Sequence, residues 1–166
     1  GSDPVNQLPE ASQIGANTFG ALVNGEPITP KGGGINPNLV AYYQLIDGEH
    51  FFSVGIIHND NRDGDTFNSL LQITNDETAI SESELIILNK SNNEDEAGGG
   101  GVFQSNDEKY NIGSFDTNET HTGELTITHL DEENRIVSGT FWFDAVNDEG
   151  EVVEVREGRF DVTYSQ

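Results

Sequence analysis

The chain has 166 residues, of which 33% are hydrophobic, and this is enough for one domain with a buried core. Its 30 acidic and 7 basic residues give a net charge of −23, which excludes a basic surface for nucleic acid or for anionic lipid headgroups. The chain has no cysteine, so disulfides, thiolate metal sites and a cysteine nucleophile are excluded as well.

The chain divides into two parts by composition. Residues 1–17 are polar, contain two prolines and lack a hydrophobic period, so we expect a flexible leader or tether there. Residues 18–166 carry hydrophobic residues mostly at every second position, which is typical of half-buried β-strands. We therefore expect a single β domain over 18–166.

Turn signals separate the hydrophobic runs. Asn24-Gly25 is a strong hairpin dipeptide, and the glycine-rich segment 31–38 and the acidic segment 91–101 are predicted loops. The predicted strands lie in a hairpin over 18–28 and then in the segments 38–47, 49–58, 67–74, 84–89, 101–106, 109–115, 123–131, 135–147 and 151–164.

This pattern predicts an all-β fold. About nine or ten strands joined by short turns indicate an antiparallel meander, which forms either a closed or partly open, calycin-like barrel or a β-sandwich. No longer segment has a convincing helical period. Gly139 and Gly158 interrupt two of the cleanest strands, and they predict bulges or sharp bends there.

Two stretches of the sequence carry a family pattern. PVNQLPEASQIGANTFGALVNGEPI occupies 4–28, and HTGELTITHLDEENRIVSGTFWFDAVN occupies 121–147, with VREGRFDVTY at 155–164. They resemble the two ends of a family of small uncharacterised lipoproteins from Bacteroidetes, whose N-terminal pattern QLPxATxxGxNTFGxLVNG follows a lipidated cysteine. The resemblance implies an exported lipoprotein anchored in the outer membrane, on its periplasmic or cell-surface side. It also implies that residues 1–17 tether the domain to the lipid, which would be its sole contact with the membrane.

One segment has the spacing of a calcium ligand set. Asn59, Asn61, Asp63 and Asp65 place oxygens at alternate positions, as in the first half of a helix–loop–helix calcium loop. The twelfth position of that loop would be Leu70, where a bidentate glutamate is expected, and no helices flank the segment. A tight polar turn is the simpler interpretation, and calcium at these four residues is the alternative.

Three aromatic residues are candidates for a ligand or partner surface. Trp142 alternates with Phe141 and Phe143, so it points away from them, and Tyr42 and Tyr43 face opposite ways on one strand. Exposed aromatic side chains suit sugar stacking or a protein interface. Coverage of the aromatic residues by loops is the alternative.

No catalytic motif is present. The chain lacks a G-x-S-x-G elbow and a phosphate loop, and with 30 carboxylates some pair lies at glycosidase spacing by chance. We therefore expect a non-enzymatic envelope lipoprotein, a binding or accessory module with a protein or glycan partner and no cofactor other than calcium. The alternatives are a barrel that binds carbohydrate or a small apolar ligand, a protein that docks a partner through its acidic face, and a carboxylate-based glycan hydrolase.

Overall fold

A computed structural model describes residues 3–32, 38–91 and 95–166. The regular elements of the described chain are strands and one short 3-10 helix, η1 (Pro4–Gln7), which confirms the all-β prediction. Most of the loop expected at 31–38 lies outside the described residues. The eleven strands in the described ranges are β1 (Thr18–Val23), β2 (Glu26–Ile28), β3 (Leu39–Ile46), β4 (Glu49–Arg62), β5 (Asp65–Asp76), β6 (Leu85–Leu88), β7 (Gly98–Ser105), β8 (Gly113–Asp116), β9 (Gly123–Asp131), β10 (Ile136–Val146) and β11 (Val152–Thr163).

Strand pairing closes the sheet into a barrel. β10 pairs with β9, β9 with β6, β6 with β7, β7 with β8, and β8 returns to β10. Only β6 and β7 run parallel within this ring. β11, β1 and β2 extend from β10 on one side, and β5, β4 and β3 extend from β7 on the other. The fold is therefore a closed five-strand barrel with further strands outside it, which is the barrel alternative of the prediction.

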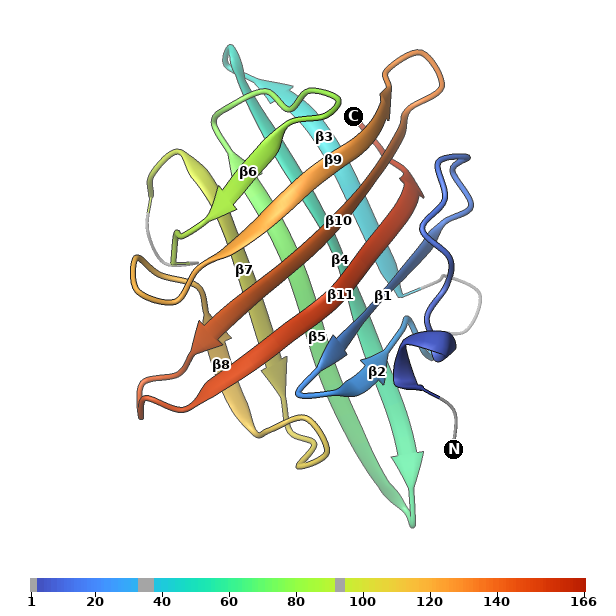
Figure 1. The fold of residues 1–166 in the computed structure, drawn as a ribbon, viewed down its shortest axis with the longest axis vertical. Coiled ribbons are helices and arrows are strands. Elements are labelled where there is room, and N and C mark those ends of the chain that lie inside the picture. The colour runs from blue at the N-terminus through green and yellow to red at the C-terminus, as the bar shows by residue number, and fades with distance from the viewer. Residues whose placement is uncertain (1–2, 33–37, 92–94) are drawn as a thin grey trace.

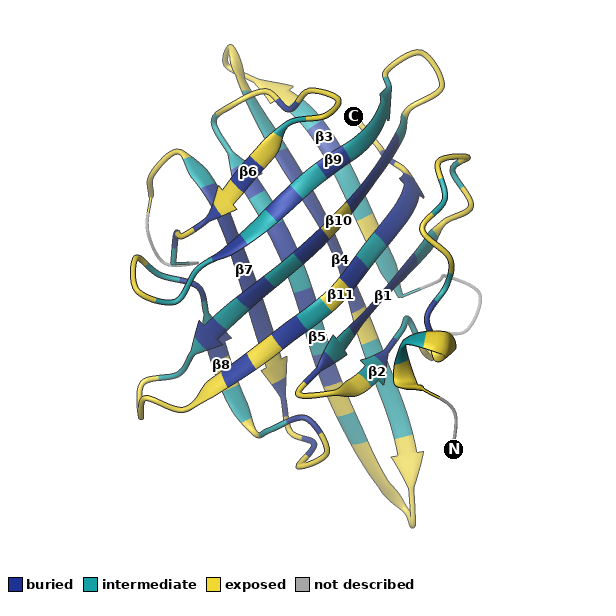
Figure 2. Cartoon of the chain, in the orientation of Figure 1, coloured by how far each residue is buried: buried dark blue, intermediate teal, exposed yellow. Residues whose placement is uncertain are grey.

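The strands form two layers around one core. Figure 1 shows β6, β9, β10, β11 and β1 crossing over β3, β4, β5 and β7. Buried and more exposed residues alternate along these strands, as Figure 2 shows. Seven of the nine phenylalanines are buried, and each contributes roughly 2–3 kcal/mol of hydrophobic stabilisation. Their rings contact one another across the interior, so a ligand is more readily accommodated at the barrel ends or on the outer faces than inside.

The two strand glycines lie beside irregular pairing, as predicted. The register shifts between Ser138 and Gly139 against β9, and between Phe141 and Phe143 against β11. A Cβ atom on Gly158 would lie 2.4 Å from the ring of Phe141. The prediction of bulges is confirmed, and glycine is needed because an aromatic ring packs directly on its backbone.

The glycine run at 98–101 is the main error in the predicted strands. We expected a loop over 91–101, of which residues 92–94 lie outside the described residues, whereas β7 begins at Gly98 and its glycines pair with β5. The absence of side chains hid the period of two that marks a strand. A Cβ atom on Gly101 would lie 2.8 Å from the ring of Phe143, so bulk is excluded there by the core.

The described part of the expected leader, residues 3–17, contacts the barrel. Leu8 is buried, and Asp161 of β11 is enclosed by the leader. Burial would raise the pKa of Asp161, but hydrogen bonds from the leader outweigh it and lower the pKa to about 2. The donors to the Asp161 carboxylate are the Ser12 and Ser138 hydroxyls and the backbone N–H groups of Ile14, Gly15 and Ala16. No helix in the described ranges is long and apolar enough to cross a membrane.

Candidate functional site

The segment proposed for calcium forms a long hairpin. β4 continues to Arg62, so Asn59 and Asn61 are strand residues that pair with β5. The turn is confined to Asp63 and Gly64, whose φ angles of 52° and 85° fit a two-residue hairpin turn. Asp65 begins β5 opposite Arg62. The four proposed ligands are thus distributed along two strands and a tip, and the expected turn over 59–65 is shorter than predicted.

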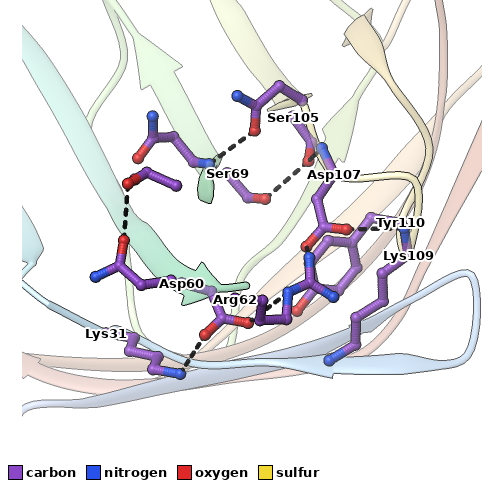
Figure 3. Close-up of polar contacts among 12 residues, drawn as sticks. Lys31, Asp60, Arg62, Ser69, Ser105, Asp107, Lys109 and Tyr110 are labelled. Atoms are coloured by element: carbon purple, nitrogen blue, oxygen red, sulfur yellow. Dashed lines mark hydrogen bonds and ion pairs between the residues drawn. The ribbon is translucent and has the colours of Figure 1, made fainter. Parts of the chain in front are cut away.

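Basic and acidic side chains form a chain of contacts near this hairpin, drawn in Figure 3. The ammonium group of Lys31 donates to Asp60 at 2.6 Å, and the guanidinium group of Arg62 lies 3.3 Å from the other oxygen of Asp60. The same guanidinium donates to Asp107 at 2.6 Å. Arg62 also stacks over the ring of Phe67, with 4.2 Å from its Cζ to the ring centroid. We call the end of the barrel where these contacts lie, around Asp60, Arg62 and Asp107, the hairpin end.

Asp107 is fixed from several sides. Its backbone N–H donates to the hydroxyl of Ser105, which shares a buried hydrogen bond with Ser69. Burial would raise the pKa of Asp107, but the hydrogen bonds from Arg62 and from the backbone of Lys109 outweigh it and lower the pKa. The carboxylate of Asp107 therefore stays charged and paired with Arg62, as in an ion-pair network that stabilises a fold.

Beside this network lies a surface depression of about 640 Å³. Asp63 and Asp65 line it together with Glu108, and Arg62 and Lys109 contribute positive charge. In the described ranges, no group of three or more histidine or carboxylate side chains is placed to hold a metal ion. Calcium at Asn59, Asn61, Asp63 and Asp65 stays a prediction.

The opposite end of the barrel has a depression of about 630 Å³ with a different lining. We call it the tyrosine end, after Tyr43 of β3 and Tyr164, which follows β11. The ring of Tyr43 stacks on His50 with 5.2 Å between centroids and meets the edge of Tyr164 at 5.8 Å. The remaining lining residues are Gln44, Leu45, Ile46, Glu132 and Gln166.

The two phenol groups at the tyrosine end are largely buried and lie near acidic residues. Burial raises the pKa of both, and the negative charge of Glu132 raises it further. The hydroxyl of Tyr43 accepts a hydrogen bond from the backbone N–H of Ile80, whereas that of Tyr164 has no bonding partner among the described residues. The depression thus combines a rigid aromatic floor with negative potential.

The other two aromatic candidates lie on outer faces of the barrel. Tyr42 points away from Tyr43 and lines a small cavity of about 210 Å³. Trp142 is half-buried on β10, where its indole N–H donates to Glu124 at 2.9 Å and the Arg156 guanidinium lies 5.2 Å from its ring. The structure therefore does not bring Trp142 together with either tyrosine.

Sequence reasoning missed two features of these surfaces. Leu45 and Ile46 are 64% and 49% exposed beside a hairpin turn, a position where polar residues are usual. Lys90, the one basic residue between Arg62 and Lys109, is buried. Two sequence signals could have indicated these features. They are the apolar pair directly before Asp47-Gly48 and the single lysine in an acidic segment.

The comparisons with known proteins give a family and no activity. A family model described as Domain of unknown function (DUF6252) matches residues 77–162, which is more than half of the chain and contains all five strands of the closed ring. No curated protein and no solved structure matches significantly.

Proposed function

The chain belongs to DUF6252, a family of domains of unknown function, and we propose that it is a non-enzymatic binding domain that holds a basic protein segment at its tyrosine end. The observation that carries the proposal is the pair of exposed apolar side chains, Leu45 and Ile46, at the rim of the 630 Å³ depression. Exposed apolar groups beside a cavity are typical of interaction sites.

The charge around the depression favours a basic partner. Glu84 and Glu132 act electrostatically on Tyr43, and Asp131 and Glu132 act on Tyr164. Arg135 is the one cation among these influences. Such an excess of carboxylates attracts Lys and Arg side chains and repels acidic surfaces, while the apolar pair supplies contact area.

Two further features favour binding over catalysis. The barrel interior is filled by packed phenylalanines, so the barrel offers surfaces more readily than a deep catalytic cleft. Every carboxyl group in the described ranges whose pKa is shifted has it lowered, as in Asp107 and Asp161, whereas a glycan hydrolase needs an acid with a raised pKa.

We also propose that the domain acts in the cell envelope as a lipoprotein, on the resemblance of its leader to lipoprotein sequences. In Figure 1 the first described residues lie near the hairpin end, far from the turn between β3 and β4. An anchor upstream of the leader would therefore present the tyrosine end away from the membrane. Incorporation of a labelled fatty acid into the precursor in its source cells tests the anchor, and an unlabelled product in the soluble fraction would contradict it.

The binding proposal is tested by nuclear magnetic resonance with a defined probe, a short peptide of alternating Lys and Leu. We expect amide shifts in segments 43–50 and 130–135, weakening as salt is added. A peptide with Glu in place of Lys is the control and should cause none. Shifts spread evenly over the acidic surface, or centred on Arg62 and Asp107, would contradict the proposal.

A further inference from the structure

We propose that the cavity beneath Tyr42 on the outer face of the sheet is a binding site for one neutral monosaccharide ring. It is separate from the tyrosine end, because Tyr42 and Tyr43 face opposite sides of β3. Its volume of about 210 Å³ is below the roughly 300 Å³ at which pockets for drug-sized ligands begin, so it suits a single small ring.

Strand register builds the cavity from small residues between two walls. Tyr42 of β3 pairs with Ser53 of β4, Ser53 pairs with Thr74 of β5, and Thr74 pairs with Gly100 of β7. Side chains in such a row project from the same face of the sheet. Tyr42 forms one wall, and the short Thr74 and Gly100 line the space beside it.

The second wall is the chain that follows β6. It crosses β7 so closely that a Cβ atom on Gly100 would lie 2.6 Å from the carbonyl oxygen of Lys90. The hydroxyl of Thr117 donates to the same carbonyl at 2.7 Å and fixes the crossing. The glycine at position 100 is therefore needed to bring Lys90 over the sheet.

Lys90 places a buried charge at the cavity. Its side chain is 7% exposed, and its ammonium group donates to Asp76 at 2.5 Å and to the backbone carbonyl of Glu96 at 2.9 Å. An ammonium group has three N–H donors, so one is left for a ligand. Burying a charged side chain costs free energy unless an opposite charge lies beside it, and Asp76 supplies that charge for Lys90. The two charges cancel, so the ion pair adds no net charge to the cavity.

The free polar groups around the cavity match a sugar. Among the described residues, the hydroxyls of Tyr42 and Thr74 have no hydrogen-bond partner, and the Gln72 amide uses one end on Ser53. Asp76 has one carboxylate oxygen free of Lys90. Donors and acceptors are thus interspersed beside an aromatic ring, as the hydroxyls and C–H face of a pyranose require.

Charge balance selects against charged sugars. Lys90 and Asp76 already neutralise each other, so a carboxylate on glucuronate or an ammonium group on glucosamine would bring an unpaired charge into the cavity and lose its hydration there. We therefore expect neutral hexoses or N-acetylhexosamines to bind at millimolar concentration, with both charged sugars binding several-fold more weakly.

The experiment is a nuclear magnetic resonance titration of the whole chain with glucose, galactose, mannose and N-acetylglucosamine, and with glucuronate and glucosamine for comparison. Amide shifts are expected at Tyr42, Thr74 and Gly100. Thr74→Val removes one hydroxyl without changing side-chain volume and should weaken binding about fivefold. Thr126→Val, at another half-buried strand threonine, is the matched control and should have no effect.

Several outcomes would overturn the site. These are no shift with any neutral sugar, shifts confined to the tyrosine end, tighter binding of glucuronate or glucosamine, and equal loss in Thr74→Val and Thr126→Val. Tyr42→Phe provides a second reading, because it keeps the ring and removes the hydroxyl. We expect binding to weaken but to persist, and unchanged affinity would remove Tyr42 from the hydrogen-bonding set.

Discussion

The two ends of the barrel have depressions of nearly equal size, and they differ in how the charges at them are paired. At the hairpin end, about 640 Å³ in volume, Arg62 is paired with Asp60 and Asp107. At the tyrosine end, about 630 Å³ in volume, Glu132 has no ion-pair or hydrogen-bond partner among the described residues. The difference shows how to interpret charge in a chain of net charge −23, because paired charges build the fold and unpaired charges are available to a partner.

The largest effect should come from breaking the paired end. Arg62→Ala leaves the buried carboxylate of Asp107 without its guanidinium and removes the stacking on Phe67, and we expect a clear fall in the free energy of unfolding. Arg135→Gln, at the tyrosine end and without an ion pair in the described ranges, should change it by less than about 0.5 kcal/mol. Urea denaturation measures both, and equal losses would contradict the contrast between the ends.

The leader runs along the barrel between the two ends and provides the next effect. The carboxylate of Asp161 accepts five hydrogen bonds. In Asp161→Asn the side-chain amide has one oxygen and one NH2 group, and the NH2 group would face some of the same donors. We expect a loss of about 2 kcal/mol and faster amide exchange at residues 12–17. Asp148→Asn, at an exposed turn carboxylate, is the control and should do neither.

The same carboxylate predicts an acid limb of stability. A carboxyl group with a lowered pKa stabilises the fold above its unfolded value, and this contribution is lost as the pH falls through the folded value. For Asp161 the loss should occur between the ordinary value of 3.8 and about 2. Urea denaturation from pH 5 to pH 2 should show a steeper decline for the native chain than for Asp161→Asn. Parallel curves would contradict this.

A smaller effect should separate the two tyrosines. Tyr43→Phe removes the acceptor for the buried N–H of Ile80 and should cost about 1 kcal/mol. Tyr164→Phe removes a hydroxyl without such a partner and should be nearly neutral. Thermal unfolding measures both variants. A larger loss of stability in Tyr164→Phe than in Tyr43→Phe would contradict the assignment of the stabilising hydrogen bond to Tyr43.

Metal should have the smallest effect. Asn59 and Asn61 lie along β4, and the carboxylates in the described ranges form no metal-binding group, so melting in EDTA and in millimolar calcium should give the same midpoint. A rise of several degrees with calcium, abolished by Asp63→Asn together with Asp65→Asn, would restore the calcium site at the hairpin tip.

Much of the fold was predictable because the strands repeat the same physical constraint. β9, β10 and β11 alternate between core and surface, and Gly139 and Gly158 marked their bulges. β7 was hidden because its glycines carry no pattern, and β4 was predicted too short because Asn59 to Arg62 are polar on both faces. Hydrophobic periodicity and turn residues cannot reveal a strand that is held by pairing with its neighbours and whose own residues show no alternation.

The sites were less predictable than the fold. The opposite orientation of Tyr42 and Tyr43 followed from alternation, and the structure places them in different cavities. Neither the buried position of Lys90 nor the arrangement of Glu132 beside Tyr164 follows from local sequence, because both depend on contacts between distant strands. The barrel closure that creates these contacts is a property of the whole chain.

The most direct test of the contrast between the ends compares two exposed apolar residues. Leu45→Ser at the tyrosine end and Ile112→Ser at the hairpin end both replace a surface side chain, the first 64% and the second 49% exposed. We predict that the affinity for the alternating Lys and Leu peptide falls about tenfold in Leu45→Ser and is unchanged in Ile112→Ser. Equal losses in the two variants, or a loss in Ile112→Ser alone, would contradict a binding site at the tyrosine end.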